Sequence, residues 1–133
     1  MTKEEKFAYW LQLAQYDLDT AQAMYKSGRW FYVVYTCQQA IEKLAKGLYN
    51  FYIGDNVPRI HNIRFILTMI EAELPVAAGP EIYELADTLS SHYRNNRYPD
   101  FSGQSNIYID KDIAANLLKK TREVFAWLLT LKK

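Results

Sequence analysis

A helical pattern of apolar and polar positions runs from Trp30 to Tyr52. Its apolar residues recur at alternating intervals of four and three, which places them along one side of a helix. These residues are Trp30, Val34, Cys37, Ile41, Leu44, Leu48 and Phe51. A second stripe beside them holds Tyr35, Gln38, Glu42, Ala45 and Tyr49. Because little of this surface is typical of a solvated face, the pattern predicts a central helix that is covered on two or more sides.

The segment before this helix predicts an antiparallel neighbour. Thr2 followed by Glu5 fits a capping box, so a first helix is expected at about residues 4–27. Gly28 can adopt the positive φ that often ends a helix. Because only two or three residues then separate the two helices, we expect them to pack as a helical hairpin.

Three more helices are predicted after the central one. The third is short and amphipathic and begins near His61. Pro80 suits the first turn of the fourth, where a backbone amide needs no partner, and Asp110 suits the N-cap of the fifth. Residues 98–109 lose helical periodicity and predict a loop. The expected fold class is therefore all-α, an up-and-down bundle of four or five helices.

Composition agrees with one helical domain and narrows the classes of partner. A chain of 133 residues, taken as a single domain over 1–133, can bury a core without disulfides or metals. The formal net charge of +1 steers the protein neither to nucleic acid nor to an anionic membrane, so any basic site must be local. No apolar run resembles a signal peptide or reaches the roughly 20 residues of a spanning helix. A cytoplasmic protein without a membrane role is expected.

Several kinds of chemistry are disfavoured by missing motifs. Cys37 is the only cysteine and lies in the apolar stripe, which argues for a reducing compartment and against a thiolate metal site. The patterns HExxH, CxxC, GxGxxG and GxxxxGK do not occur, so neither a metal nor a cofactor is expected. With two histidines and no GxSxG elbow, a hydrolytic triad is disfavoured as well.

The end of the predicted fourth helix concentrates polar residues that are candidates for a site. Arg97 falls four residues after Tyr93 and extends an apolar stripe, where a guanidinium needs an anion or carbonyl groups. In one interpretation, Arg94 and Arg97 cap the helix and pair with carboxylates such as Glu42. In the other, an anion site binds phosphate groups while aromatic side chains stack on bases. The residues of that site would be Lys46, His92, Arg94 and Arg97.

Glu42, Lys46 and His61 are further candidates for ligand binding, and each also has a structural interpretation. His61 would stand at the start of the third helix as a structural residue. Glu42 and Lys43 could be solvated helix residues, and Lys46, one turn after Glu42, could simply pair with it.

Four features occur in order over nearly the whole chain. They are an opening helix with Trp10, Ala14, Asp17, Leu18 and Ala21, the run QQAIEKLAK at residues 38–46, the isolated His61, and Arg97 to Asp100 after the fourth helix. Together with a closing helix that contains Trp127, they resemble the HEPN domain, a family named for its occurrence in higher eukaryotes and prokaryotes. The resemblance implies a helical bundle that usually dimerises and is often encoded beside a minimal nucleotidyltransferase, as a toxin and antitoxin pair.

The resemblance also raises the possibility of ribonuclease activity, because many members of the family are metal-independent RNases. Their signature is Arg, four to six residues and then His, at the end of the fourth helix. After Arg94 the positions for the histidine hold Pro99, Asp100 and Phe101, and after Arg97 they hold Ser102, Gly103 and Gln104. The chain resembles the branch that lacks the nuclease motif, for which binding of a nucleotide or a partner is the usual suggestion.

The main hypothesis is a binding module that takes a nucleotide or RNA phosphate and works beside a nucleotidyltransferase. The 11 tyrosines favour a C2 homodimer, because tyrosine is enriched at protein interfaces. One alternative is a metal-independent RNase in which His92, Arg94 or Tyr98 substitutes for the missing histidine. Another is a purely structural interaction or antitoxin-like scaffold. The missing signature argues against an enzyme.

Overall fold

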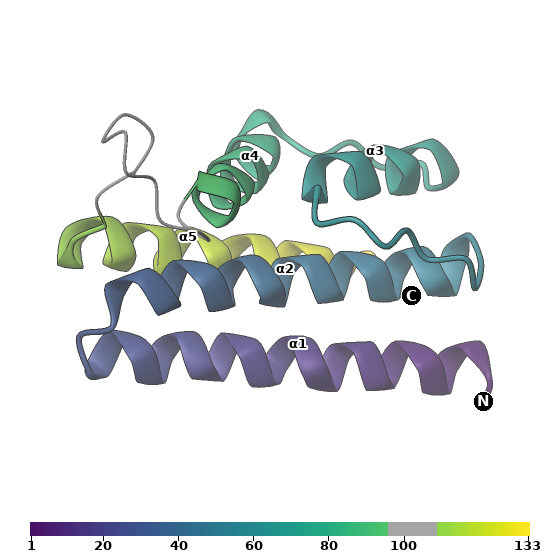
Figure 1. Cartoon of the computed structure of the whole chain (residues 1–133). Coiled ribbons are helices and arrows are strands. Elements are labelled where there is room, and N and C mark those ends of the chain that lie inside the picture. Colours follow the sequence, from purple (N-terminus) through teal and green to yellow (C-terminus); the bar gives the residue numbers. More distant parts are fainter. Residues whose placement is uncertain (96–108) are drawn as a thin grey trace.

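The computed structural model describes residues 1–95 and 109–133, and these ranges contain five helices and no strand (Figure 1). The helices are α1 (Lys3–Lys26), α2 (Trp30–Tyr52), α3 (Ile63–Glu73), α4 (Pro80–Asn95) and α5 (Lys111–Thr130). The predicted all-α class is confirmed. Of the predicted loop at 98–109, all but Ile109 lies outside the described residues.

The first two helices form the predicted antiparallel hairpin (Figure 1). α1 begins at the predicted capping box, in which Thr2 Oγ1 accepts from the Glu5 amide at 3.0 Å and Glu5 Oε1 accepts from the Thr2 amide at 2.9 Å. Gly28 adopts a φ of 75°, a value that side chains with a Cβ rarely tolerate. This turn lets the chain reverse within three residues and brings α2 back along α1.

α2 is the central helix, as the two stripes predict. α3 and α4 cross one side of it, α1 lies along another, and α5 lies behind it in Figure 1. Its apolar residues Cys37, Leu44 and Leu48 are fully buried, and so is most of its second stripe. Because helices of the same chain cover both stripes, α2 offers no large free face to a second molecule.

Helix caps place the shorter elements around α2. Asn62 Oδ1 accepts from the Phe65 amide at 3.3 Å and starts α3, so His61 lies just before that helix. Asp110 Oδ1 accepts from the Ile113 amide at 2.8 Å and starts α5, as predicted. Within residues 1–95 and 109–133, none of the helices has the length and apolar character needed to cross a bilayer.

Gly47 sets how closely α1 and α2 approach. A Cβ at this position would lie 2.7 Å from Trp10 Cβ, which belongs to the base of a side chain and cannot swing away. The close approach also allows Trp10 Nε1 to donate to Asn50 Oδ1 at 3.3 Å. The hairpin geometry therefore depends on the absence of a side chain at Gly47.

We expect Gly47→Ala to lower the free energy of unfolding by about 1–3 kcal/mol, because the two helices must move apart. Urea denaturation would measure this change in the free energy of unfolding. Gly54→Ala is the matched control, since nothing lies within 4 Å of its Cβ position. A Gly47→Ala protein as stable as wild type would contradict the close approach, because alanine otherwise favours helix over glycine.

The buried Cys37 gives a second prediction. Burial raises the pKa of its thiol to about 11, so the thiol is protonated at pH 8. Since the thiolate is the attacking species, we expect the disulfide reagent DTNB to label the native protein at least about a hundredfold more slowly than the protein unfolded in urea. Rapid labelling in native buffer would show that Cys37 is not part of a closed core.

Candidate functional site

The most polar part of the interior lies on one face of α2. Gln38, Glu42 and Lys46 follow one another at intervals of four, so a helix places them in one row. All three are buried, although most of the other buried residues of this helix are apolar. Burial of polar and charged groups is costly unless they are paired, so this row requires partners.

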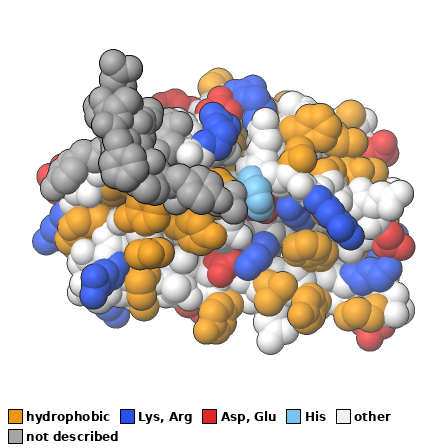
Figure 2. All heavy atoms as spheres, viewed as in Figure 1, with side chains coloured by type: hydrophobic (Ala, Val, Ile, Leu, Met, Phe, Trp, Pro, Cys, Tyr) orange, Lys and Arg blue, Asp and Glu red, His pale blue; other side chains and the backbone are white. Residues whose placement is uncertain are grey.

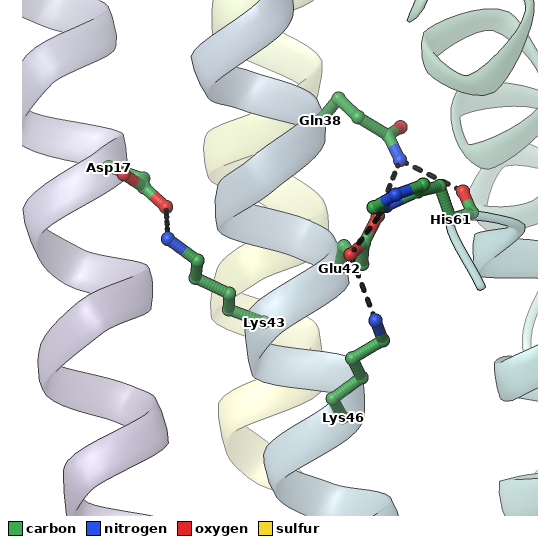
Figure 3. Close-up of polar contacts among 6 residues, drawn as sticks. All are labelled: Asp17, Gln38, Glu42, Lys43, Lys46 and His61. Carbon is green, nitrogen blue, oxygen red and sulfur yellow. Dashed lines mark hydrogen bonds and ion pairs between the residues drawn. The ribbon is translucent and has the colours of Figure 1, made fainter. Parts of the chain in front are cut away.

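The partners come from the row itself and from His61 (Figure 3). Lys46 Nζ donates to Glu42 Oε2 at 3.0 Å, and Gln38 Nε2 donates to Glu42 Oε1 at 3.1 Å. His61 Nδ1 lies 3.0 and 3.1 Å from the two carboxylate oxygens of Glu42. Gln38 Nε2 also donates to the His61 carbonyl at 3.0 Å. We call these four residues the Glu42 cluster.

Glu42 orients the His61 imidazole from its buried side. The His61 side chain is 48% exposed, whereas the Glu42 side chain is only 5% exposed. An ionised carboxylate can only accept hydrogen bonds, so Nδ1 carries the proton and donates to Glu42. In the neutral imidazole Nε2 is then an acceptor, and within the described residues it makes no hydrogen bond. A buried acid thus holds an imidazole whose second nitrogen is available.

Tyr93 of α4 contacts the imidazole, and Tyr35 of α2 stacks on Tyr93 in turn. The His61 and Tyr93 rings have centroids 5.0 Å apart, and Tyr93 stacks on Tyr35 of α2 at 5.3 Å. Because Glu42 and Tyr93 are both in the core, the ring of His61 is positioned by packing as well as by hydrogen bonds.

Lys43 belongs to the hairpin and not to the Glu42 cluster. Its Nζ lies 2.6 Å from Asp17 Oδ2, and Figure 3 shows it pointing towards α1, away from His61. The run at residues 38–46 therefore serves two faces of α2. One face carries the polar row, and the other ties α2 to α1.

A pocket of about 350 Å³ adjoins the Glu42 cluster at Lys46. It lies between α1, α2 and the connection that follows α2. Its lining residues are Lys6, Trp10, Lys46, Asn50, Asp55, Val57, Pro58 and Arg59. We call it the basic pocket, because three cations face a single carboxylate, which gives a net charge of +2.

The charges of the basic pocket are only partly paired. Asp55 Oδ1 accepts from Lys6 Nζ and from Asn50 Nδ2, both at 2.9 Å, and these bonds hold the pKa of Asp55 below its usual value. Arg59 is exposed and has no ion pair among the residues described. In Figure 2, Lys and Arg side chains lie on several sides of a histidine near the middle of the face. The pocket therefore offers a free guanidinium.

The structure brings together three of the residues singled out from the sequence, namely Glu42, Lys46 and His61. His92 lies elsewhere: it is 8% exposed and lines a groove between α4 and α5, and burial lowers the pKa of its imidazole. Arg94 is exposed on α4. The predicted residues Arg97 and Tyr98 lie outside the described ranges. Among described residues, Glu42 pairs with Lys46 and His61 and with no arginine.

Sequence reasoning missed Lys6 and Arg59. Helical spacing could have shown that Lys6 and Trp10 share a face of α1. No periodicity covers Arg59, however, because its position depends on the path of the connection between α2 and α3. In the described part of the chain, no three His, Cys, Asp or Glu side chains form a group that could hold a metal ion.

Comparison with known proteins identifies the family. The profile of the HEPN domain matches residues 7–132. Two solved structures are similar, each with 24% identity: ST0689, described as an archaeal HEPN homologue, and TT1696 from Thermus thermophilus. The alignment with ST0689 covers 96% of this chain and 98% of that one with a TM-score of 0.74, and the alignment with TT1696 covers 94% and 97% with a TM-score of 0.75.

At this level of identity the two structures support the fold alone, and no curated protein matches the chain significantly. The family profile, in contrast, covers nearly the whole sequence and agrees with the resemblance of its motifs. This chain belongs to the HEPN domain family.

Proposed function

We propose that this HEPN domain binds the phosphate groups of a nucleotide or of RNA at the basic pocket. The observation that carries the proposal is the exposed guanidinium of Arg59, which has no ion pair among described residues and shares a pocket with Lys6 and Lys46. A guanidinium can bind two phosphate oxygens at once, which favours it for this role.

The balance of charge supports an anionic ligand. The pocket itself has a net charge of +2, and the neighbouring carboxylate of Glu42, which pairs with Lys46, reduces the local total to +1. A phosphate would therefore meet a field that is still positive. Trp10 adds an aromatic wall, against which a base can pack without sequence preference.

The proposed ligand path extends from the basic pocket towards His61. Lys46 lines the pocket and also contacts Glu42, which holds His61, so the pocket and the imidazole are joined through two side chains. The exposed side chain of Arg94 on α4 is a further phosphate contact in this proposal. Arg97 and His92 remain predictions from the sequence.

Association is a separate part of the proposal. Tyr9, Leu13 and Tyr16 share one face of α1, and both tyrosines are more than half exposed. Because tyrosine favours interfaces, this stripe supports a C2 homodimer through α1. A nucleotidyltransferase partner, a toxin and antitoxin role and a scaffold function are supported by family membership alone. The buried, reduced Cys37 is consistent with the proposed cytoplasmic location.

The Glu42 and His61 pair favours a second candidate function, cleavage of RNA without a metal. In this proposal His61 Nε2 takes the proton of a ribose 2′-hydroxyl, whose oxygen attacks the adjacent phosphorus. The bond from phosphorus to the 5′ oxygen breaks, and the proton passes from the imidazolium to that oxygen. The products are a 2′,3′-cyclic phosphate and a 5′-hydroxyl.

This reaction suits the site because the substrate supplies its own nucleophile. The chain therefore needs only an oriented base and cations beside the phosphate, and His61, Lys46 and Arg59 provide them. Glu42 acts as a positioning residue, since it fixes the tautomer of His61 as a buried acid does in a catalytic triad. His61 replaces His92, Arg94 and Tyr98 as the proposed base.

For binding, we expect Arg59→Ala to weaken the affinity for a fluorescein-labelled 12-nucleotide RNA and for ATP by about tenfold, because a charged hydrogen-bond donor is lost. Fluorescence anisotropy and calorimetry would measure it, and wild-type affinity should fall as salt rises. The matched control is Arg29→Ala, which removes an exposed arginine from the turn between α1 and α2. An equal loss in both variants, or none in either, would reject the basic pocket.

For cleavage, we expect His61→Ala to lower the single-turnover rate on the same RNA by about 10² to 10⁴, while the affinity changes little. Added imidazole should restore part of the rate, above the rate that imidazole gives without protein. Glu42→Gln should lower kcat with little effect on KM, and His92→Gln should leave kcat unchanged. An RNA with one 2′-deoxyribose should be cut everywhere except at that residue.

Two results would contradict RNA cleavage with His61 as the base. RNA that stays intact at high concentrations of a folded, RNA-binding protein would leave the chain a binding module only. Cleavage that persists in His61→Ala would show that another residue is the base.

A further inference from the structure

A second and larger hollow lies between α4 and α5, with a volume of about 580 Å³. It shares no residue with the basic pocket, so the proposed function does not use it. Its apolar lining consists of Ile82, Leu85, Ile113, Leu117, Val124 and Trp127. We call this hollow the α4–α5 groove.

The groove is elongated along both helices. Its lining on α4 extends from Glu81 to His92, and its lining on α5 extends from Ile113 to Trp127. At 1.5 Å per residue these stretches measure roughly 16 and 21 Å. The groove is therefore about as long as an α-helix of three to four turns, the usual length of a helix that binds in such a groove.

Charged side chains border the groove, and their balance is acidic. Among the residues that the structure describes, Glu81 and Glu84 of α4 and Glu123 of α5 face a single cation, Lys120, which gives this part of the border a net charge of −2. All four are exposed, and within residues 1–95 and 109–133 none takes part in an ion pair. The three carboxylates are thus available to cations of another molecule.

The inner lining contains a polar atom that lacks a partner. His92 is 8% exposed, and its Nδ1 is buried without a hydrogen bond to any described residue. Such an atom costs about 1–3 kcal/mol and is uncommon in folded proteins, where buried polar groups nearly always find a partner. His92 also lines a small pocket with Phe31 and Tyr35 of α2, so this buried atom does not itself point to a ligand in the groove.

We propose that the α4–α5 groove binds an amphipathic helix of a partner protein, with aliphatic side chains in the groove and Lys or Arg on its flanks. The aliphatic side chains would cover Ile113 and Trp127, which are partly exposed, and the cations would pair with Glu84 and Glu123. This surface is independent of nucleotide or RNA binding at the basic pocket.

A second copy of this chain fits the groove less well. A symmetric contact places the same surface on both sides, so the acidic borders of two copies would face each other. Like charges at an interface are repulsive, and only Lys120 would oppose this. The charge balance therefore favours a basic partner.

The test uses a designed 15-residue helical peptide with leucines at positions 1, 5, 8 and 12 and lysines beside them. The control peptide has glutamate in place of each lysine. We follow the indole N–H signals of the full chain by NMR, after assigning Trp127 with Trp127→Phe. The lysine peptide should shift the Trp127 signal and leave those of Trp10 and Trp30 in place, whereas the glutamate peptide should bind at least about fivefold more weakly.

Charge reversal on the groove border gives the matching test from the protein side. The double variant Glu84→Lys with Glu123→Lys should bind the lysine peptide about fivefold or more weakly than wild type does. It should bind the glutamate peptide more tightly than wild type does. Both positions are exposed, so the fold should be kept, as circular dichroism would show. Glu73→Lys is the control, because it makes the same change at an exposed end of α3, away from the groove.

Three outcomes would overturn the proposal. One is equal binding of the two peptides, which would show that the acidic border does not select a basic partner. Another is a Trp127 signal that does not move at millimolar lysine peptide. The third is a Trp127 signal that moves with protein concentration alone while light scattering reports a dimer, which would assign the groove to a second copy.

Discussion

A carboxylate buried in the central helix is the constraint on which the rest of the structure depends. Glu42 lies among apolar helices, and a buried charge without a partner would cost several kcal/mol. Lys46, one turn away, neutralises it, but the carboxylate has more acceptor sites than one ammonium can fill. His61 and Gln38 fill them, and through His61 the connection between α2 and α3 is held against α2. The pairing that stabilises the interior thus also fixes the course of this connection.

The same pairing produces the site. Because the connection is held at His61, the residues before it, including Arg59, border Lys46 and the start of α1. A buried acid that must be satisfied therefore yields an exposed imidazole with a fixed tautomer and, next to it, a pocket with an unpaired guanidinium. The structural interpretation of Glu42 and His61 and the functional one do not compete, since the hydrogen bonds that lower the cost of burial are those that orient the imidazole.

Much of the fold could be predicted from the sequence because its information is local. The spacing of apolar residues predicts α2 from Trp30 to Tyr52, and the caps at Thr2 and Asp110 mark where α1 and α5 begin. The pairing of Lys46 with Glu42 is local as well. The contact of His61 with Glu42 is not, because it joins residues 19 apart through a connection without periodicity. For the same reason helical spacing alone could not show that Arg59 lines the same pocket as Lys46.

α4 explains why candidate residues that are adjacent in the sequence belong to different surfaces. Consecutive residues of a helix point about 100° apart, so His92 and Tyr93 have largely different neighbours. Tyr93 packs on the imidazole of His61, whereas His92 lines the groove against α5. A grouping of Arg94 with His92 by sequence proximity therefore combines an exposed cation with a buried, neutral ring. The helix separates the side that contacts His61 from a groove with an acidic border, and each residue of α4 acts according to its face and not its neighbours in the chain.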